Sequence, residues 1–540
     1  MSGKDKPPFN RNDQIGRRRN RKQDPYPRPK LEASGASVIA LKNIDVGEPD
    51  ANAEFFLAQR SSDDPMYLQA FYDWEGVSND ALISGKKFIL FGQKGTGKTA
   101  VLRNLENRLR EDYSTGFVVF RKEIIEEAQL ASIAATFSAN IMVDEEKIKE
   151  SKFYYHAMKR LLITFLLSKC AEIDEIPDEI GWFKSLYDDL RKSSIGQIAS
   201  LVTDSVIGSL EAVKIDVEKA TRGIAKVDAS KAIKRSNDAF QKFAFEKFRA
   251  EKMRVRLFLD EMHFAYRDTD SLSADASLVR DTILAVRELN ERLIESGLDS
   301  LIYLSIRSEF LEHQEIAVAD VSHTIESYGI ELSWESAPYN KAHPMFDLVL
   351  KRLNVTFENK LTKEEMLLRY IPQSNIDRFL EYTWGKPRDI IRYFKAAMNA
   401  YPNAGSIKIK PDFGNVIRKY SQAAWQDQKA ALAAFVPKNS IPKVEEALQE
   451  IANRDLDKSK VYTKGDVSSV LSSAFGDMKS NGVTYDMDEF IKLLYIVGVF
   501  FVTYRDASGQ RIIHQFHRGN RKPYSRGEFH IHRAVARALS

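Results

Sequence analysis

The stretch from Gly92 to Thr99 carries the pattern G-x-x-x-x-G-K-[ST], which is typical of loops that bind the phosphates of a nucleotide. Gly95 and Gly97 lack a Cβ, so successive backbone N–H groups can turn toward a phosphate chain. Lys98 would contact the β- and γ-phosphates, and the Thr99 hydroxyl would bind Mg²⁺. The predicted binding residues of this stretch are Gly92, Gln93, Lys94, Gly95, Thr96, Gly97, Lys98, Thr99 and Ala100.

Two neighbouring carboxylates, Asp260 and Glu261, follow the apolar run 255–259 and could complete a hydrolytic site. Asp260 would hold Mg²⁺ through the water shell of the metal, and Glu261 would orient or deprotonate the attacking water. The alternative is an acidic pair that caps the N-terminus of the next helix. We therefore expect catalytic roles for Glu261 and Lys98, and metal binding by Thr99 and Asp260.

Two arginines stand where contact with a bound phosphate is expected. Arg307 ends the apolar run 300–306, and ligands of open α/β sheets lie outside the carboxyl ends of the strands. Its alternative role is a surface ion pair. Arg388 follows Pro387, which suits the first turn of a helix, so Arg388 could reach a nucleotide from a helical lid. Its alternative is a solvated helix face.

Short buried strands and longer helices must position these residues. Apolar runs predict strands at 87–91, 116–120, 255–261, 300–308 and 330–334. We expect an α/β fold with a parallel sheet, in which the strand of Arg307 lies beside that of Asp260. The predicted organisation is a disordered basic arm at 1–35, a P-loop ATPase domain at 36–340 with a helical insert at about 122–253, a helical lid domain at 341–435, and a winged-helix-like domain with a basic tail at 436–540.

Two helical regions of the predicted ATPase domain carry apolar faces. Residues 38–86 have apolar positions at helical spacing and are expected to pack beside the sheet. In the insert, aromatic faces around Phe165 and Phe240 could stack single-stranded bases. Docking of these amphipathic helices on their own domain is the alternative, and it is favoured.

The C-terminal region combines three predicted helices with a hairpin. Ser440 and Thr463 can cap the first two helices, the third is expected at 486–497, and the strands are expected at 500–504 and 511–516. This is a winged-helix arrangement. The third helix begins with acidic residues and is poorly suited to reading bases in a major groove. Phosphate contacts or protein docking fit the basic residues after the hairpin better.

Composition places the chain among ordinary soluble globular proteins, with 43% hydrophobic and 29% charged residues. The single cysteine, Cys170, excludes an internal disulfide framework, so we expect a reducing, cytoplasmic setting. The longest apolar run, 493–502, is too short for a membrane span, and no membrane contact is expected. Lys and Arg concentrate in residues 1–30 and 511–540, which predicts either non-specific nucleic-acid contact or solubility and partner-binding tails.

These motifs together resemble the AAA+ ATPases of the origin-recognition (initiator) type, over residues from about 38 to the end. The chain looks similar to a bacterial stand-alone branch that is also related to signal-transduction ATPases and is sometimes found in anti-phage defence loci. The resemblance implies that Arg388 is the lid "sensor 2" arginine, that Pro387 lies near the base, and that Arg307 follows the sensor 1 strand. It also implies ATP and Mg²⁺ as ligands.

The function that this resemblance implies is an ATP-driven switch that hydrolyses ATP slowly. Such a switch would control homo-oligomer assembly or a partner effector, including one in anti-phage defence. Two alternatives stay open at this point. The chain could be a nucleotide-gated scaffold whose hydrolysis is incidental, or a DNA-binding ATPase of the initiator kind.

Overall fold

A computed structural model describes residues 37–61, 64–73, 79–119, 153–170, 176–177, 183, 229–262, 269–311, 316–334, 337, 340–371, 376–407, 411–432, 436, 440–456, 462–475, 486–520 and 522–540. The predicted basic arm at 1–35 and most of the insert at 122–253 lie outside the described residues. Within the described ranges, no helix combines the length and apolar character that a membrane span requires.

A five-stranded sheet organises the first part of the chain, and its strands pair in parallel in the order β2-β3-β4-β1-β5. The strands are β1 (Ile89–Gly92), β2 (Ser114–Val119), β3 (Val255–Met262), β4 (Leu301–Arg307) and β5 (Gly329–Glu331). Continuous apolar runs form them because a parallel sheet is buried on both faces. The predicted parallel sheet and the pairing of β3 with β4 are confirmed.

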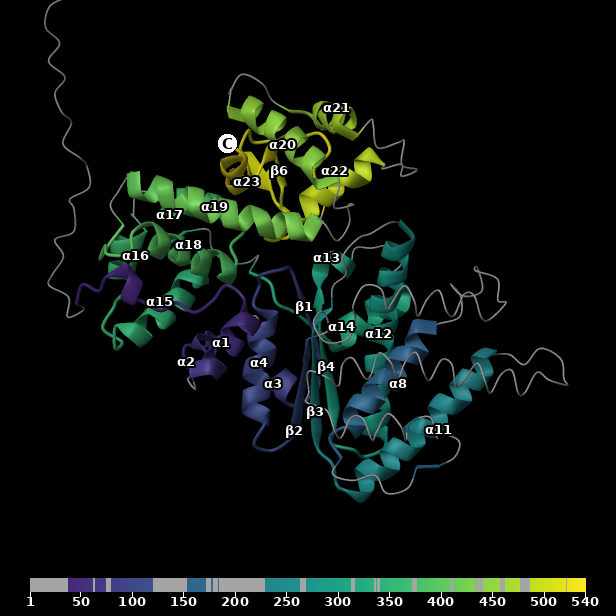
Figure 1. Cartoon of the computed structure of the whole chain (residues 1–540). Coiled ribbons are helices and arrows are strands. Elements are labelled where there is room, and N and C mark those ends of the chain that lie inside the picture. Colours follow the sequence, from purple (N-terminus) through teal and green to yellow (C-terminus); the bar gives the residue numbers. More distant parts are fainter. Residues whose placement is uncertain are drawn as a thin grey trace, which may run out of the picture.

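Helices cover both faces of this sheet (Figure 1). Helix α4 (Lys98–Leu109) lies on one face, and α8 (Phe153–Leu167), α11 (Ala229–Ala250) and α12 (Thr269–Glu295) lie on the other. Phe165 of α8 and Phe240 of α11 are 6% and 0% exposed. The aromatic faces therefore dock on their own domain, and the alternative that these two side chains stack bases is wrong.

Helices dominate the chain after β4. They are α13 (Ser308–Leu311), α14 (Ala319–Tyr328), α15 (Pro344–Thr356), α16 (Lys363–Tyr370), α17 (Ile376–Glu381), α18 (Pro387–Ala400) and α19 (Pro411–Leu432). Local signals explain where they begin. Thr362 and Glu365 form a capping box at α16, and Pro387 occupies the first turn of α18 as predicted.

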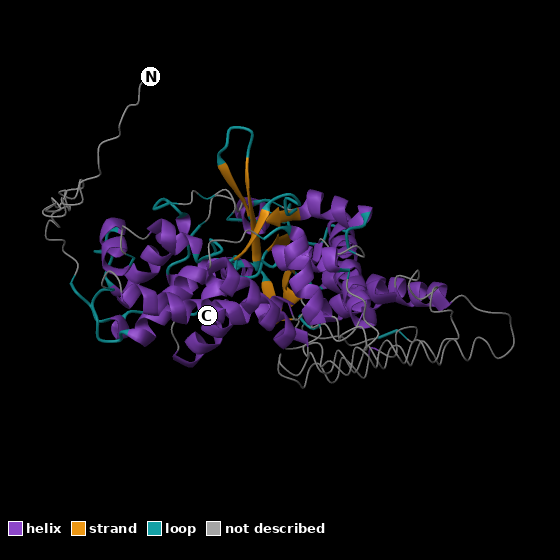
Figure 2. Cartoon of the chain, turned by 90° about the horizontal axis from the view of Figure 1, so that it is seen from above, coloured by secondary structure: helices purple, strands orange, loops and turns teal. Residues whose placement is uncertain are grey.

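The described part of the C-terminal region contains four α-helices, one 3-10 helix and a three-stranded antiparallel sheet in the order β7-β6-β8. Its elements are α20 (Ile441–Leu456), α21 (Lys464–Phe475), α22 (Met487–Ile496), β6 (Phe500–Arg505), β7 (Arg511–His514), the 3-10 helix η6 (Phe516–Arg518), β8 (Glu528–Ile531) and α23 (Arg533–Leu539). The predicted hairpin is confirmed, and it projects from the body of the molecule (Figure 2). Neither β8 nor α23 was expected from the sequence, because four alternating residues and seven helical ones give only a weak periodic signal.

Two clusters of buried hydrophobic residues hold the described part of the chain together. One surrounds the parallel sheet, and the other runs without a break from α15 to the C-terminal region. Helices α15 to α19 occupy the predicted lid domain and are called the lid helices below. Trp384 joins them to the C-terminal region, because its Nε1 donates to the Gly498 carbonyl at 2.9 Å and its ring stacks on His532 at 4.1 Å.

The N-terminal segment bridges both clusters. It forms η1 (Leu41–Asn43), α1 (Ala51–Ser61), α2 (Met66–Gln69) and α3 (Asn79–Ile83). Leu82 of α3 packs in the sheet cluster, whereas Leu41 and Val46 belong to the lid cluster. The prediction that 38–86 packs beside the sheet is therefore wrong for the residues around Leu41. Helical spacing identifies a buried face, but it does not identify the core that buries it.

Gly498→Ala should weaken the docking of the C-terminal region on the lid helices. Gly498 has φ +80°, and an added Cβ would lie 2.5 Å from Trp384 Nε1. We expect steric overlap to reduce the free energy of unfolding by about 1–3 kcal/mol beyond the backbone cost. Gly509→Ala is the matched control, because Gly509 has φ +82° with open space around it. Equal losses in thermal unfolding for both variants would show that contact with Trp384 is not the cause.

Candidate functional site

The loop that joins β1 to α4 is a tight turn at the carboxyl edge of the sheet. Gly95 and Gly97 have φ values of +87° and +101°, which residues with a Cβ rarely adopt. A Cβ on Gly92 would lie 2.5 Å from the Leu332 carbonyl oxygen. Trp334 Nε1 donates to the Thr96 carbonyl at 3.1 Å. The glycines of the motif are thus required by the observed backbone.

Lys98 lies over this loop, where its Nζ donates to the carbonyls of Gly92 and Gln93 at 2.7 and 3.0 Å. Burial lowers the pKa of Lys98 to about 8, although Glu309 and Asp260 oppose that shift. Gln93 Nε2 is also buried and has no hydrogen-bond partner. An anion at the loop would stabilise the charged Lys98 ammonium, so the loop is suited to a phosphate group.

Asp260 connects the two halves of the predicted site. The Thr99 hydroxyl donates to Asp260 Oδ2 at 2.8 Å, and the Ser305 hydroxyl donates to Asp260 Oδ1. Asp260 is 1% exposed, so these hydroxyl groups, and not bulk water, supply hydrogen bonds to its carboxylate. One carboxylate and one hydroxyl fit Mg²⁺, which keeps several water ligands in most protein sites. In the described part of the chain, no three His, Cys, Asp or Glu side chains gather where they could hold a metal.

Glu261 departs from regular strand geometry. Its φ is +56°, in a left-handed region that is uncommon for a residue with a side chain, and the β3–β4 register shifts between Leu259 and Met262. Glu261 lines the same cavity as Lys98, and its Oε1 accepts a hydrogen bond of 3.3 Å from Asn52 Nδ2. Asn52 Nδ2 also lies 3.5 Å from Asp260 Oδ2, so the two acids share this partner, and Asp260 in addition accepts from Thr99 and Ser305.

Arg388 extends from α18 to the loop. It packs on Gly95, where an added Cβ would lie 3.3 Å from Arg388 Cβ. Its guanidinium is 3.1 Å from Asp427 Oδ2 on α19, and Asp427 also contacts Lys94 at 3.2 Å and Arg392 at 2.6 Å. Burial favours the neutral form of Asp427, but these three cations outweigh it and hold its pKa well below the usual range. The lid helices are therefore in direct contact with the loop.

Arg307 and Glu309 lie at the end of β4, beside the loop. Both side chains are buried. Glu309 Oε1 accepts the Lys94 backbone N–H at 3.1 Å, and its Oε2 has no hydrogen-bond partner. Burial alone would raise the pKa of Glu309, but the nearby Arg307, Lys386 and Lys98 hold it below the usual value. Glu309 is therefore an ionised acid within the cationic part of the site.

These groups surround one cavity of about 510 Å³, a volume typical of pockets for small-molecule ligands. The predicted residues that line it are Lys94, Gly95, Thr96, Gly97, Lys98, Thr99, Ala100, Asp260, Glu261, Arg307, Pro387 and Arg388. Gly92 and Gln93 are in the loop but outside this lining. The cavity also borders the N-terminal segment, through Tyr67 and Tyr72, and the lid helices, through Leu348.

Sequence analysis missed four residues that contact the predicted ones. Asn52 reaches both carboxylates, Glu309 binds the loop backbone, Asp427 binds three cations, and Trp334 donates to the loop. Asn52 lies in the N-terminal segment, for which the sequence predicted only packing beside the sheet. The proximity of Glu309 to Arg307 in the sequence was a signal that could have identified Glu309. Asn52 and Asp427 belong to no motif, so no sequence pattern indicated them.

Comparison of the chain with protein-family models, with curated proteins and with solved structures finds no match. The chemistry of the site must therefore be argued from its own residues.

Proposed function

We propose that this chain is an ATP-binding and slowly hydrolysing molecular switch of AAA+ type that uses Mg²⁺. The observation that carries the proposal is the hydrogen bond between Thr99 and Asp260. It joins a glycine-rich loop to an acidic pair at the carboxyl edge of a parallel sheet, which is where α/β sheets bind ligands. A phosphate-binding loop and a metal-binding acid can act on the same phosphate group only when they lie next to each other.

Each residue of the proposed site has one role. The loop N–H groups and Lys98 bind the phosphates, while Thr99 and Asp260 hold Mg²⁺, which neutralises charge on the phosphate oxygens when it is bound. Glu261 orients the attacking water and takes its proton. Arg307 and Arg388 contact the terminal phosphate from the sheet and from the lid, respectively.

We further propose that the C-terminal region is a winged-helix-like unit through which the switch acts on another copy of the chain or on a partner effector protein. Its continuous core with the lid helices supports this proposal, because lid movement would then be transmitted to the C-terminal region. Asp488 and Glu489 begin α22, and this acidic start favours a protein partner over the major groove of DNA. A role in anti-phage defence rests on the family resemblance.

Lys98→Ala should weaken the binding of Mg-ATP. The loss of charge-assisted contacts to phosphate corresponds to roughly a ten- to hundredfold weaker affinity. Isothermal calorimetry measures it, and because the pKa of Lys98 is about 8, binding by the wild type near that pH should also take up protons. Lys86→Ala, an exposed lysine before β1, is the control. Equal ATP affinity of the wild type and Lys98→Ala would refute the proposed phosphate site.

A further inference from the structure

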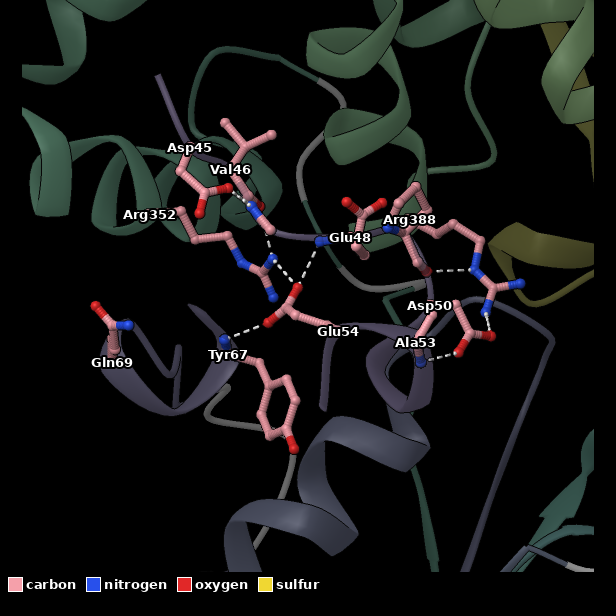
Figure 3. A network of polar contacts seen from close by, with 12 residues as sticks. Asp45, Val46, Glu48, Asp50, Ala53, Glu54, Tyr67, Gln69, Arg352 and Arg388 are labelled. Atoms are coloured by element: carbon pink, nitrogen blue, oxygen red, sulfur yellow. Dashed lines mark hydrogen bonds and ion pairs between the residues drawn. The ribbon is translucent and has the colours of Figure 1, made fainter. Parts of the chain in front are cut away.

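Residues 45–54, which we call the strap, contact both the lid helices and the carboxylate pair, and Figure 3 shows the contacts at the lid end. The strap leads from η1 into the first turn of α1, and Asp50 Oδ1 caps that helix by accepting the Ala53 N–H at 3.0 Å. The strap thus combines an extended segment with a helix end, and each of these makes contacts outside the N-terminal segment.

The lid end of the strap is held by a buried ion pair. Arg352 of α15 donates to Glu54 Oε2 at 3.1 Å and to the Val46 carbonyl at 2.7 Å, and the two charged side chains are 7% and 5% exposed. Glu54 also accepts the backbone N–H groups of Glu48 and Tyr67, each at 2.6 Å. The Glu54 carboxylate thus binds α15, the extended part of the strap and α2 at the same time (Figure 3). A shift of α15 would therefore displace the first turn of α1.

A second contact joins the strap to Arg388. The Arg388 Nε donates to the Pro49 carbonyl at 2.9 Å, and its guanidinium lies 3.7 Å from Asp50 Oδ2 (Figure 3). The same arginine is bound to Asp427 on α19. Any movement of Arg388 toward a ligand in the cavity would therefore change its contacts with the turn that begins α1.

The site end of the strap is Asn52, which is 2% exposed. Its Nδ2 lies 3.3 Å from Glu261 Oε1 and 3.5 Å from Asp260 Oδ2. Arg103 of α4 donates to Asn52 Oδ1 at 3.4 Å. A guanidinium can only donate, so it requires the amide oxygen on its own side and directs the NH₂ group to the two acids.

We propose that Asn52 is a positioning residue for Glu261 and that the strap couples this position to the lid. The inference rests on the proposed ATPase function. Asn52 lies between Asp50 and Glu54, the two strap residues that pair with lid arginines. The first turn of α1 therefore contacts both the lid and the proposed catalytic carboxylate. A displacement of about 1 Å at a reacting group can reduce a rate a hundredfold, so small shifts of α1 suffice to change hydrolysis.

The first test compares Asn52→Ala and Asn52→Asp in the full chain by steady-state hydrolysis and by ATP calorimetry. Asn52→Asp keeps the shape and the acceptor for Arg103 but places a like charge beside two carboxylates. We expect kcat to fall by about tenfold or more in both variants, while ATP affinity stays within about twofold. Gln59→Ala, an exposed residue on α1, should leave kcat unchanged. A lower kcat with unchanged ATP affinity indicates positioning, whereas a general structural role would reduce both kcat and affinity.

The second test addresses the coupling through Glu54→Gln, which alters the strap without touching the cavity. We expect this variant to lower kcat, and the double variant with Asn52→Ala to lose no more than Asn52→Ala alone, because both changes act through one contact. Additive losses would refute the coupling.

The outcomes of these tests distinguish the two proposals. Wild-type kcat in a folded Asn52→Asp variant would refute the positioning role while leaving the ATPase proposal intact. Absence of ATP hydrolysis by the wild type would overturn the proposed function and this inference together. Thermal unfolding of each variant identifies any that does not fold. If Asn52→Ala does not fold, the kcat of Asn52→Asp tests the positioning role.

Discussion

Replacing Glu261 with glutamine should remove most ATP hydrolysis and leave ATP binding intact. Glu261 lines the cavity and is the proposed base, whereas Asp260 accepts from Thr99 and Ser305 and is the proposed metal ligand. An amide cannot act as that base, and the loss of a general base corresponds to roughly a hundred- to ten-thousandfold lower kcat. Glutamine preserves the contact with Asn52, because its carbonyl oxygen still accepts the hydrogen bond.

Phosphate release and ATP calorimetry on the same preparation measure the two expectations for Glu261→Gln. Glu331→Gln is the matched control, because Glu331 also ends a strand of the sheet but does not line the cavity. Equal hydrolysis by the wild type and Glu261→Gln would exclude Glu261 as the base. A matching loss of ATP affinity would instead indicate that Glu261 contributes to ligand binding.

Arg388→Ala should abolish the preference for ATP over ADP. The γ-phosphate carries charge that ADP lacks, so a lid guanidinium gains a charge-assisted contact only with ATP. Such a contact contributes about 1.5–3 kcal/mol, or roughly ten- to a hundredfold in affinity. Arg388 is paired with Asp427, and a γ-phosphate must compete with that carboxylate. This competition gives the lid two alternative sets of contacts, as a two-state switch requires.

Calorimetry with ATP and ADP measures this discrimination, and small-angle scattering measures the compaction that should accompany ATP binding. Lys429→Ala is the matched control, because Lys429 is a lid cation on α19 that pairs with Glu445, and neither residue lines the cavity. If Arg388→Ala still prefers ATP and still compacts, the lid does not sense the γ-phosphate. Arg307, at the end of β4, would then become the better candidate for this contact.

Local patterns in the sequence predicted the backbone elements that carry the candidate site residues. The glycine spacing predicted the turn between β1 and α4, and the observed φ values of Gly95 and Gly97 explain why that spacing is needed. The apolar run before Asp260 predicted a strand, and the observed β3 contains both acids and ends one residue later, at Met262. Residues that are neighbours in sequence constrain one another through short backbone segments, so type and spacing carry this information.

The sequence by itself thus determined a parallel α/β sheet with a glycine-rich loop and an acidic pair at one edge. Only the tertiary structure decided which distant side chains complete that edge. Asn52 and Asp260 are separated by 208 positions, and Arg352 and Glu54 by 298. No local spacing relates such residues, because their contacts depend on how α1 and the lid helices pack. That packing is set by the sum of many weak apolar contacts, to which no single motif corresponds.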